Sequence, residues 1–184
     1  MKNILFITTR NPYSGRFSGD VIRSAKIINY LKKNHNIDVA FLGEQNNSKS
    51  INTNMIGFKQ PNFFLKVFFC LISFIKLNPI QFGIFFSQRL KEFIQDNAHK
   101  YDILFFYHIR SSQFFPKNFY GKTILEMGDL YSKNYKLTYK NLSLLNPFFY
   151  FYFLESFLVK RFEKKIIKIF DKIILFSKNE VDKI

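Results

Sequence analysis

Short apolar runs recur along the chain, and they constrain the fold more than any other feature of the sequence. Residues 4–7 and 37–42 are two such runs, each followed by a polar or glycine-containing segment. Between them, Val21, Ala25 and Ile28 recur at helical spacing. Apolar strands joined through a helix are typical of a parallel sheet that is buried on both faces, so this stretch predicts a β-α-β unit.

The same alternation continues to the end of the sequence. Further strands are expected at residues 55–58, 102–107, 123–127 and 172–176, and further helices at about 62–77, 80–97 and 146–170. This order predicts an α/β protein with a Rossmann-like parallel sheet and helices on both faces, formed by residues 1–176. With 47% hydrophobic and 20% aromatic residues, the chain is far from the composition of a disordered protein. A lone cysteine, Cys70, excludes a disulfide framework.

The charge is strongly positive, because 28 Lys and Arg stand against 13 Asp and Glu for a net +15. Such a balance is typical of proteins that bind nucleic acid or anionic membranes. Phe, Ile, Lys and Asn also share AT-rich codons, so genome composition alone could raise all four. The basic residues are scattered and no known nucleic-acid module appears, so we expect no nucleic-acid partner.

The sequence is compatible with a protein that rests on the surface of a membrane without crossing it. No apolar run reaches the roughly 20 residues that span a bilayer, and the start lacks the apolar region of a signal peptide. Residues 63–75 and 148–154 are rich in aromatic side chains and lie beside lysines, as in helices that rest on an anionic bilayer. Packing in the core would explain the same aromatic residues. We therefore expect a cytoplasmic protein with peripheral contact to the inner face of the plasma membrane. The basic residues that follow the second stretch are Lys160, Arg161, Lys164, Lys165 and Lys168.

Candidate binding residues follow the strands, because ligands of parallel sheets bind at the carboxyl ends of the strands. After the first strand, Gly15 and Gly19 precede a helix whose free amides could bind phosphate. Asp20 and Arg23 lie at the start of that helix, and Arg23 could reach an anion or remain a surface residue. The loop matches neither the dinucleotide fingerprint nor the P-loop, so an ordinary βα turn is the alternative.

Two later strand ends carry titratable side chains. His108 could act as a general base or have a purely structural role. Asp129 could bind or deprotonate a hydroxyl, or cap the following helix, which begins near Ser132. Ser132 is taken as a further substrate- or phosphate-binding residue. No histidine pair has the spacing of metal ligands, so no metal is expected.

Taken in order, these segments resemble the N-terminal domain of a family-4 glycosyltransferase with the GT-B fold, of the bacterial exopolysaccharide type. The similarity is to the family's opening strand and glycine loop, its short segment before the third helix, its histidine- and aspartate-bearing strand ends, and its glutamate-bearing helix. The residues that carry it are 4–13 with Gly15, Gly19, Asp20 and Arg23, then 80–87, 101–108, 123–132, Glu155, 161–163 and 170–177.

The resemblance implies a function and assigns roles. It implies a domain that holds a glycan or lipid-linked acceptor and receives a sugar from a nucleotide-sugar donor without a metal, in surface polysaccharide synthesis. Gly15 and Gly19 would approach the donor diphosphate, and His108 and Asp129 would lie at the reaction centre. Residues 177–184 would begin the connection to a C-terminal donor-binding domain, without which the chain is expected to be inactive. The alternative is a non-catalytic α/β module that docks on an anionic membrane or a protein partner.

Overall fold

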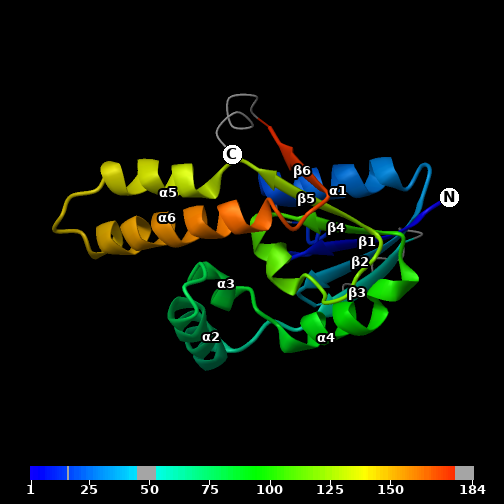
Figure 1. The fold of residues 1–184 in the computed structure, drawn as a ribbon, viewed down its shortest axis with the longest axis horizontal. Helices are drawn as coiled ribbons and strands as arrows, with labels where there is room; N and C mark the ends of the chain where they lie inside the picture. Colours follow the sequence, from blue (N-terminus) through cyan, green and yellow to red (C-terminus); the bar gives the residue numbers. More distant parts are fainter. Residues whose placement is uncertain (16, 45–52, 177–184) are drawn as a thin grey trace.

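A six-stranded, all-parallel sheet forms the centre of the protein (Figure 1). The computed structural model describes residues 1–15, 17–44 and 53–176. The strand order β3-β2-β1-β4-β5-β6 is that of a doubly wound Rossmann-like fold, which confirms the predicted fold class. The strands are β1 (Asn3–Thr8), β2 (Asn36–Leu42), β3 (Asn54–Phe58), β4 (Ile103–Tyr107), β5 (Lys122–Gly128) and β6 (Lys172–Leu175).

Helices pack on both faces of this sheet. The α-helices are α1 (Gly19–Leu31), α2 (Phe63–Ile75), α3 (Gln81–Ile84), α4 (Gln88–Asn97), α5 (Tyr131–Lys140) and α6 (Pro147–Ile166), and η1 (Ala98–Lys100) and η2 (Ile109–Phe114) are 3-10 helices. Successive side chains of a strand point to opposite faces. In β1, Ile4 and Phe6 pack with Ile28 of α1, whereas Leu5 and Ile7 join the core formed with α4 and α6.

The helix expected at residues 80–97 is in fact two helices, and this part of the prediction is wrong. A buried glutamate, Glu155 of α6, accepts hydrogen bonds from the amides of Ile80 (2.8 Å) and Gln81 (3.1 Å) and so fixes the start of α3. Ser87 then begins a new helix, because its hydroxyl accepts a hydrogen bond from the amide of Leu90. A residue distant in sequence therefore divides the segment.

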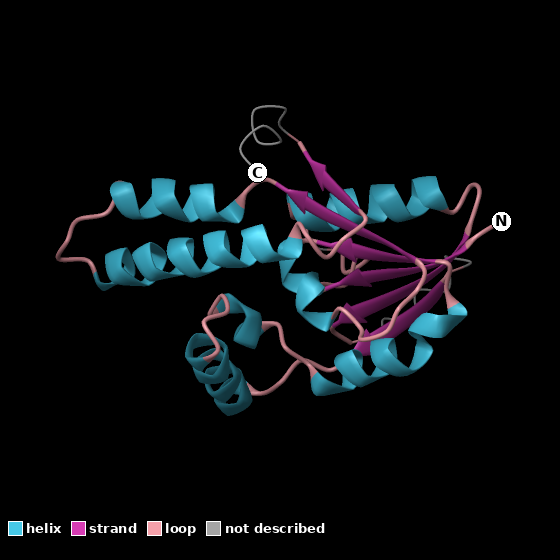
Figure 2. Cartoon of the chain, viewed as in Figure 1, coloured by secondary structure: helices cyan, strands magenta, loops and turns pink. Residues whose placement is uncertain are grey.

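Three helices lie on the side toward which the strands point. The antiparallel pair α5 and α6 projects beyond the carboxyl ends of the strands, and α2 lies on the same side, below α6 in the view of Figure 2. Every residue of α2 is described, and none is buried. None of the described helices is long and apolar enough to cross a membrane. Residues 177–184, expected to begin an interdomain connection, lie outside the described residues.

Candidate functional site

The site lies where β1 and β4 separate at the carboxyl edge, the switch point of this strand order. One hydrogen bond joins the segments that follow the two strands. The hydroxyl of Tyr107, at the end of β4, donates to the main-chain carbonyl of Asp20 in α1 over 2.9 Å. The start of α1 and the residue after Tyr107, His108, are therefore brought together, as the strand-end argument predicted.

The loop before α1 leaves open space at the helix N-terminus. Gly15 has a φ of +71°, a conformation that glycine adopts without strain. A Cβ atom added at Gly15 or at Gly19 would meet no atom within 4 Å. Packing therefore does not require glycine at position 19, and there is open space beside the start of α1. Of the first amides of this helix, that of Val21 donates to the Asp20 carboxylate over 3.0 Å and that of Ile22 to the Ser18 carbonyl. Beside this loop is a cavity of about 710 Å³ whose lining includes Arg10, Ser14 and Ser18.

The carboxylate of Asp20 is bound by two residues of this loop and is not a free charge. Its carboxylate lies 2.6 Å from Arg10 and accepts a 2.5 Å hydrogen bond from the Ser18 hydroxyl. Partial burial raises the pKa of Asp20, but the Ser18 hydrogen bond and the Arg10 charge outweigh this effect and hold the pKa below its ordinary value. The negative charge of Asp20 is thus balanced by Arg10, which reduces its repulsion of an anion at the start of α1.

His108 has a backbone conformation rare for a side chain of its size, with a φ of +68°. The turn is fixed on both sides, because its amide donates to Glu126 in β5 and its carbonyl accepts from the amide and hydroxyl of Ser111. The ring is held by Tyr131, whose hydroxyl is hydrogen-bonded to Nδ1. The other ring nitrogen, Nε2, is buried and has no hydrogen-bond partner among the described residues. Such an arrangement stores strain at a position where a ligand can supply the missing partner.

The surroundings of His108 determine which role its ring can have. Burial, reinforced by the Arg110 charge, lowers the pKa of His108 to about 4, so the ring is neutral at neutral pH. Burial raises the pKa of Tyr131 to about 12, so its hydroxyl keeps its proton. We assign that proton to the hydrogen bond with Nδ1, which leaves the ring proton on Nε2. Nε2 is then a buried hydrogen-bond donor without a partner among the described residues, and a base with so low a pKa is a weak proton acceptor.

Arg23 pairs with a residue of the protein itself, although 40% of its side chain is exposed. Its Nη2 atom lies 3.2 Å from Oε1 of Glu126, and its guanidinium group lies over the ring of Phe176. Glu126 is only 2% exposed. Burial raises the pKa of Glu126 to about 7, opposed by Arg23 and reinforced by Asp129. Sequence reasoning missed Glu126 as a functional residue, although a glutamate inside the apolar run at 123–127 is a visible signal.

A second arginine, Arg110, lies closer to His108 than sequence reasoning indicated. Its Nε atom donates to the side chain of Gln81 over 2.8 Å, and its guanidinium group lies 4.6 Å from the ring centre of Phe85 and 5.8 Å from that of Tyr131. Tyr131 thus links Arg110 to the His108 ring. Its position two residues after His108, in the segment that follows the same strand, is a signal in the sequence that could have found it.

Asp129 and Ser132 have different surroundings. Asp129 is exposed, and the N-cap position of α5 is Leu130, where no side chain caps the helix. Ser132 is buried, and both its amide and its hydroxyl donate to the carboxylate of Glu163 in α6, over 3.1 and 2.5 Å. The structure therefore leaves Asp129 accessible at the edge, whereas it holds Ser132 against α6 and away from the His108 ring.

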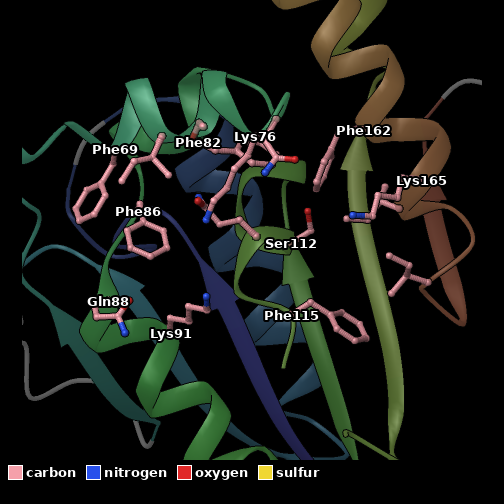
Figure 3. Close-up of a pocket in the computed structure, with 16 residues that line it drawn as sticks. Phe69, Lys76, Phe82, Phe86, Gln88, Lys91, Ser112, Phe115, Phe162 and Lys165 are labelled. Atoms are coloured by element: carbon pink, nitrogen blue, oxygen red, sulfur yellow. The ribbon is translucent and has the colours of Figure 1, made fainter. Parts of the chain in front are cut away.

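Another cavity, of about 480 Å³, lies between α2, α4 and α6 (Figure 3). Phenylalanine rings surround it, and Lys91 and Lys165 lie on opposite sides of it. Leu77, between the lining residues Lys76 and Asn78, has a φ of +53°, but no histidine lines this cavity, so it has no counterpart of the unpartnered ring nitrogen at the switch-point site. Across the described residues, no three His, Cys, Asp or Glu side chains gather as a metal site.

The fold and this edge define a class, a Rossmann-like α/β protein with a candidate ligand site at the switch point. Comparison with family models and with curated proteins finds no match to this chain. The functional conclusion therefore depends on the site itself.

Proposed function

We propose that this chain is the acceptor-side half of a glycosyltransferase. It would pass a sugar from a nucleotide-sugar donor to a glycan or lipid-linked acceptor in surface polysaccharide synthesis. The single observation that carries the proposal is the buried Nε2 donor of neutral His108 beside the open N-terminus of α1. A hydrogen-bond donor next to a helix N-terminus suits a ligand that combines hydroxyl and phosphate oxygens.

We assign the following roles. The first amides of α1, beside the open space at Gly15 and Gly19, would bind the diphosphate, and Nε2 of His108 would donate to a sugar oxygen. During transfer, the bond between the anomeric carbon and the phosphate oxygen breaks and a bond to the acceptor oxygen forms. Asp129 is accessible to take the proton of the acceptor hydroxyl. The resemblance assigns most contacts with the nucleotide to a second domain, so we expect residues 1–184 alone to bind ligand without turnover.

The test is ligand binding rather than activity. Wild type, His108→Ala and the exposed control His99→Ala would be compared by ligand-observed NMR with uridine diphosphate sugars and lipid-free acceptor glycans. Loss of one hydrogen bond from a buried donor should weaken binding by roughly 1–3 kcal/mol in His108→Ala only. Equal binding by both variants, or no binding by wild type to any ligand of the panel, would contradict the proposal.

A second function is favoured by α2, a helix with aromatic side chains and no buried residue. In this alternative, the chain is a non-catalytic module that docks on an anionic membrane or a protein partner. Binding of wild type to anionic vesicles combined with no response to any sugar ligand would select this function. The glycosyltransferase function and the membrane-docking form of this alternative both place the protein peripherally at the inner face of the plasma membrane, and that location is part of the proposal.

A further inference from the structure

The helices α5 and α6 project side by side from the sheet (Figure 1). A groove of about 720 Å³ runs between them. It is separate from the switch-point site. Lysine and aromatic side chains line it, among them Lys136, Tyr139, Phe153, Phe157, Lys160 and Lys164.

The groove is cationic at one end and apolar at the other. Its base lies where α5 begins and α6 ends, and the Ser132 hydrogen bonds to Glu163 hold the helices together there. Lys160 and Lys164 lie one turn apart toward this base. Farther out, the rings of Tyr139 and Phe153 meet with their centres 5.5 Å apart.

The apolar character continues to the tip of the hairpin. Leu145, in the connection between the two helices, is 94% exposed, and Phe148 and Tyr150 are exposed at the start of α6. The groove therefore leads from ammonium groups at its base to an apolar tip.

Lys136, Lys160 and Lys164 place three ammonium groups in this groove. Among the described residues, no carboxylate lies within 4 Å of the side-chain nitrogen of Lys136, Lys160 or Lys164. Three such groups on facing helices are complementary to a phosphate group, for which lysine is a common ligand. An ion alone would use only this end and would leave the aromatic end exposed.

We propose that this groove binds the phosphate head group of an anionic membrane lipid, with the hydrocarbon chain lying along the aromatic end toward the hairpin tip. The direction fits a tip inserted into the bilayer interface, because the head group of the lipid would then lie at the hairpin base and its chain in the apolar layer. This inference goes beyond the proposed function and holds whether or not the chain transfers sugar.

The first arm of the test separates a lipid from a free anion. The full chain would be titrated with inorganic phosphate and with short-chain phosphatidic acid and phosphatidylcholine below their micelle concentrations, and binding followed by NMR. Phosphatidic acid should bind at least about ten-fold more tightly than either of the others, because only it engages both ends of the groove. If inorganic phosphate bound as tightly as phosphatidic acid, the proposed role of the apolar end would be overturned. If phosphatidylcholine bound as tightly as phosphatidic acid, the proposed role of the lysines would be overturned.

The second arm locates the site with variants of equal charge. The triple variant Lys136→Gln, Lys160→Gln, Lys164→Gln would be compared with Lys2→Gln, Lys33→Gln, Lys117→Gln, whose exposed lysines precede strands at the opposite edge of the sheet. All six positions are exposed, so both proteins should fold, as circular dichroism would verify.

In flotation with vesicles of phosphatidylcholine and phosphatidylglycerol in equal amounts, the groove variant should lose on the order of 10²-fold in binding. The control should lose far less, because its lysines lie beyond the screening length from the bound membrane. Equal loss in both variants would show that net charge, rather than the groove, attracts the lipid and would overturn the inference.

Discussion

At the scale of single residues, His108 and Glu126 are neighbours in the sheet whose pKa values are displaced in opposite directions. Burial lowers the pKa of His108 from 6.5 to about 4 and raises that of Glu126 from 4.5 to about 7. Between pH 4 and 6.5 the unfolded chain binds a proton at His108 that the folded protein does not, so stability falls as the pH falls. Between pH 4.5 and 7 the folded protein keeps a proton on Glu126 that the unfolded chain releases, so stability falls as the pH rises.

These opposing effects offset each other in the wild type, and single variants should reveal each one. In His108→Gln, the free energy of unfolding should decrease as the pH rises from 4.5 to 7, by up to roughly 2–3 kcal/mol. In Glu126→Gln, it should instead decrease as the pH falls from 6.5 toward 4. Urea unfolding at a series of pH values measures both, with His99→Gln as a control that should follow the wild type. Identical pH profiles in the two variants would show that neither group titrates as its burial requires.

Residues of the site differ in how far the sequence could reveal them. His108 could be found because it follows an apolar strand, and strand ends of parallel sheets meet at one edge. The hydrogen-bonding state of its ring could not, because Tyr131 lies 23 residues away in sequence and reaches the ring only through folding. For Arg23 the sequence was misleading. Its place at the start of the first helix suggested that it could bind an anion, but in the structure it pairs with Glu126, which lies about a hundred residues away in β5.

At the scale of elements, α2 depends on one glycine for its attachment to the rest of the protein. A Cβ atom on Gly83 of α3 would lie 2.2 Å from the main-chain nitrogen of Cys70 in α2. Such a distance is a clash between main chains, so Gly83→Ala should push α2 away from α3. The cores on the two faces of the sheet contain no residue of α2 among their buried members, so they should survive.

The expected outcome is therefore local. Hydrogen exchange in Gly83→Ala should accelerate in α2 by at least about ten-fold, with a much smaller change in β1 and β4. Gly19→Ala is the matched control, because a Cβ atom there meets nothing within 4 Å. Unchanged exchange in α2, or equal acceleration throughout the sheet, would contradict this account of how α2 is attached.

Strands of this protein were predictable and some helix boundaries were not, for a physical reason. A parallel strand is buried on both faces, so its signal lies in its own residues, as in Phe6 and Phe105. The break between α3 and α4 depends on Glu155, whose carboxylate replaces helix-internal partners from 75 residues away in sequence. No local pattern of residues records such a contact.

At the scale of the whole molecule, exposed apolar side chains gather on the side that holds the candidate site. An apolar cavity of about 580 Å³ is lined by α2, by α3 and by Leu154 of α6, so α2 and the hairpin belong to one surface. A membrane bound to this surface would lie beside the carboxyl edge of the sheet, where His108 is located. The proposed peripheral location thus implies a single orientation of the protein on the bilayer.

The chain contains no tryptophan, so single tryptophans can report this orientation. Phe64→Trp in α2 and Leu145→Trp at the hairpin tip replace side chains that are 81% and 94% exposed, and Tyr120→Trp replaces one that is 96% exposed just before β5, at the opposite edge. With anionic vesicles, the fluorescence of the first two should shift to shorter wavelength and be quenched by brominated lipid, because their indoles enter an apolar layer. The third should remain unchanged, because its edge faces away from the bilayer.

A shift at Tyr120→Trp equal to the other two would mean that the protein binds without a fixed orientation. A shift at only one of the first two would mean that α2 and the hairpin do not contact the bilayer together, and that the site does not face the membrane as proposed.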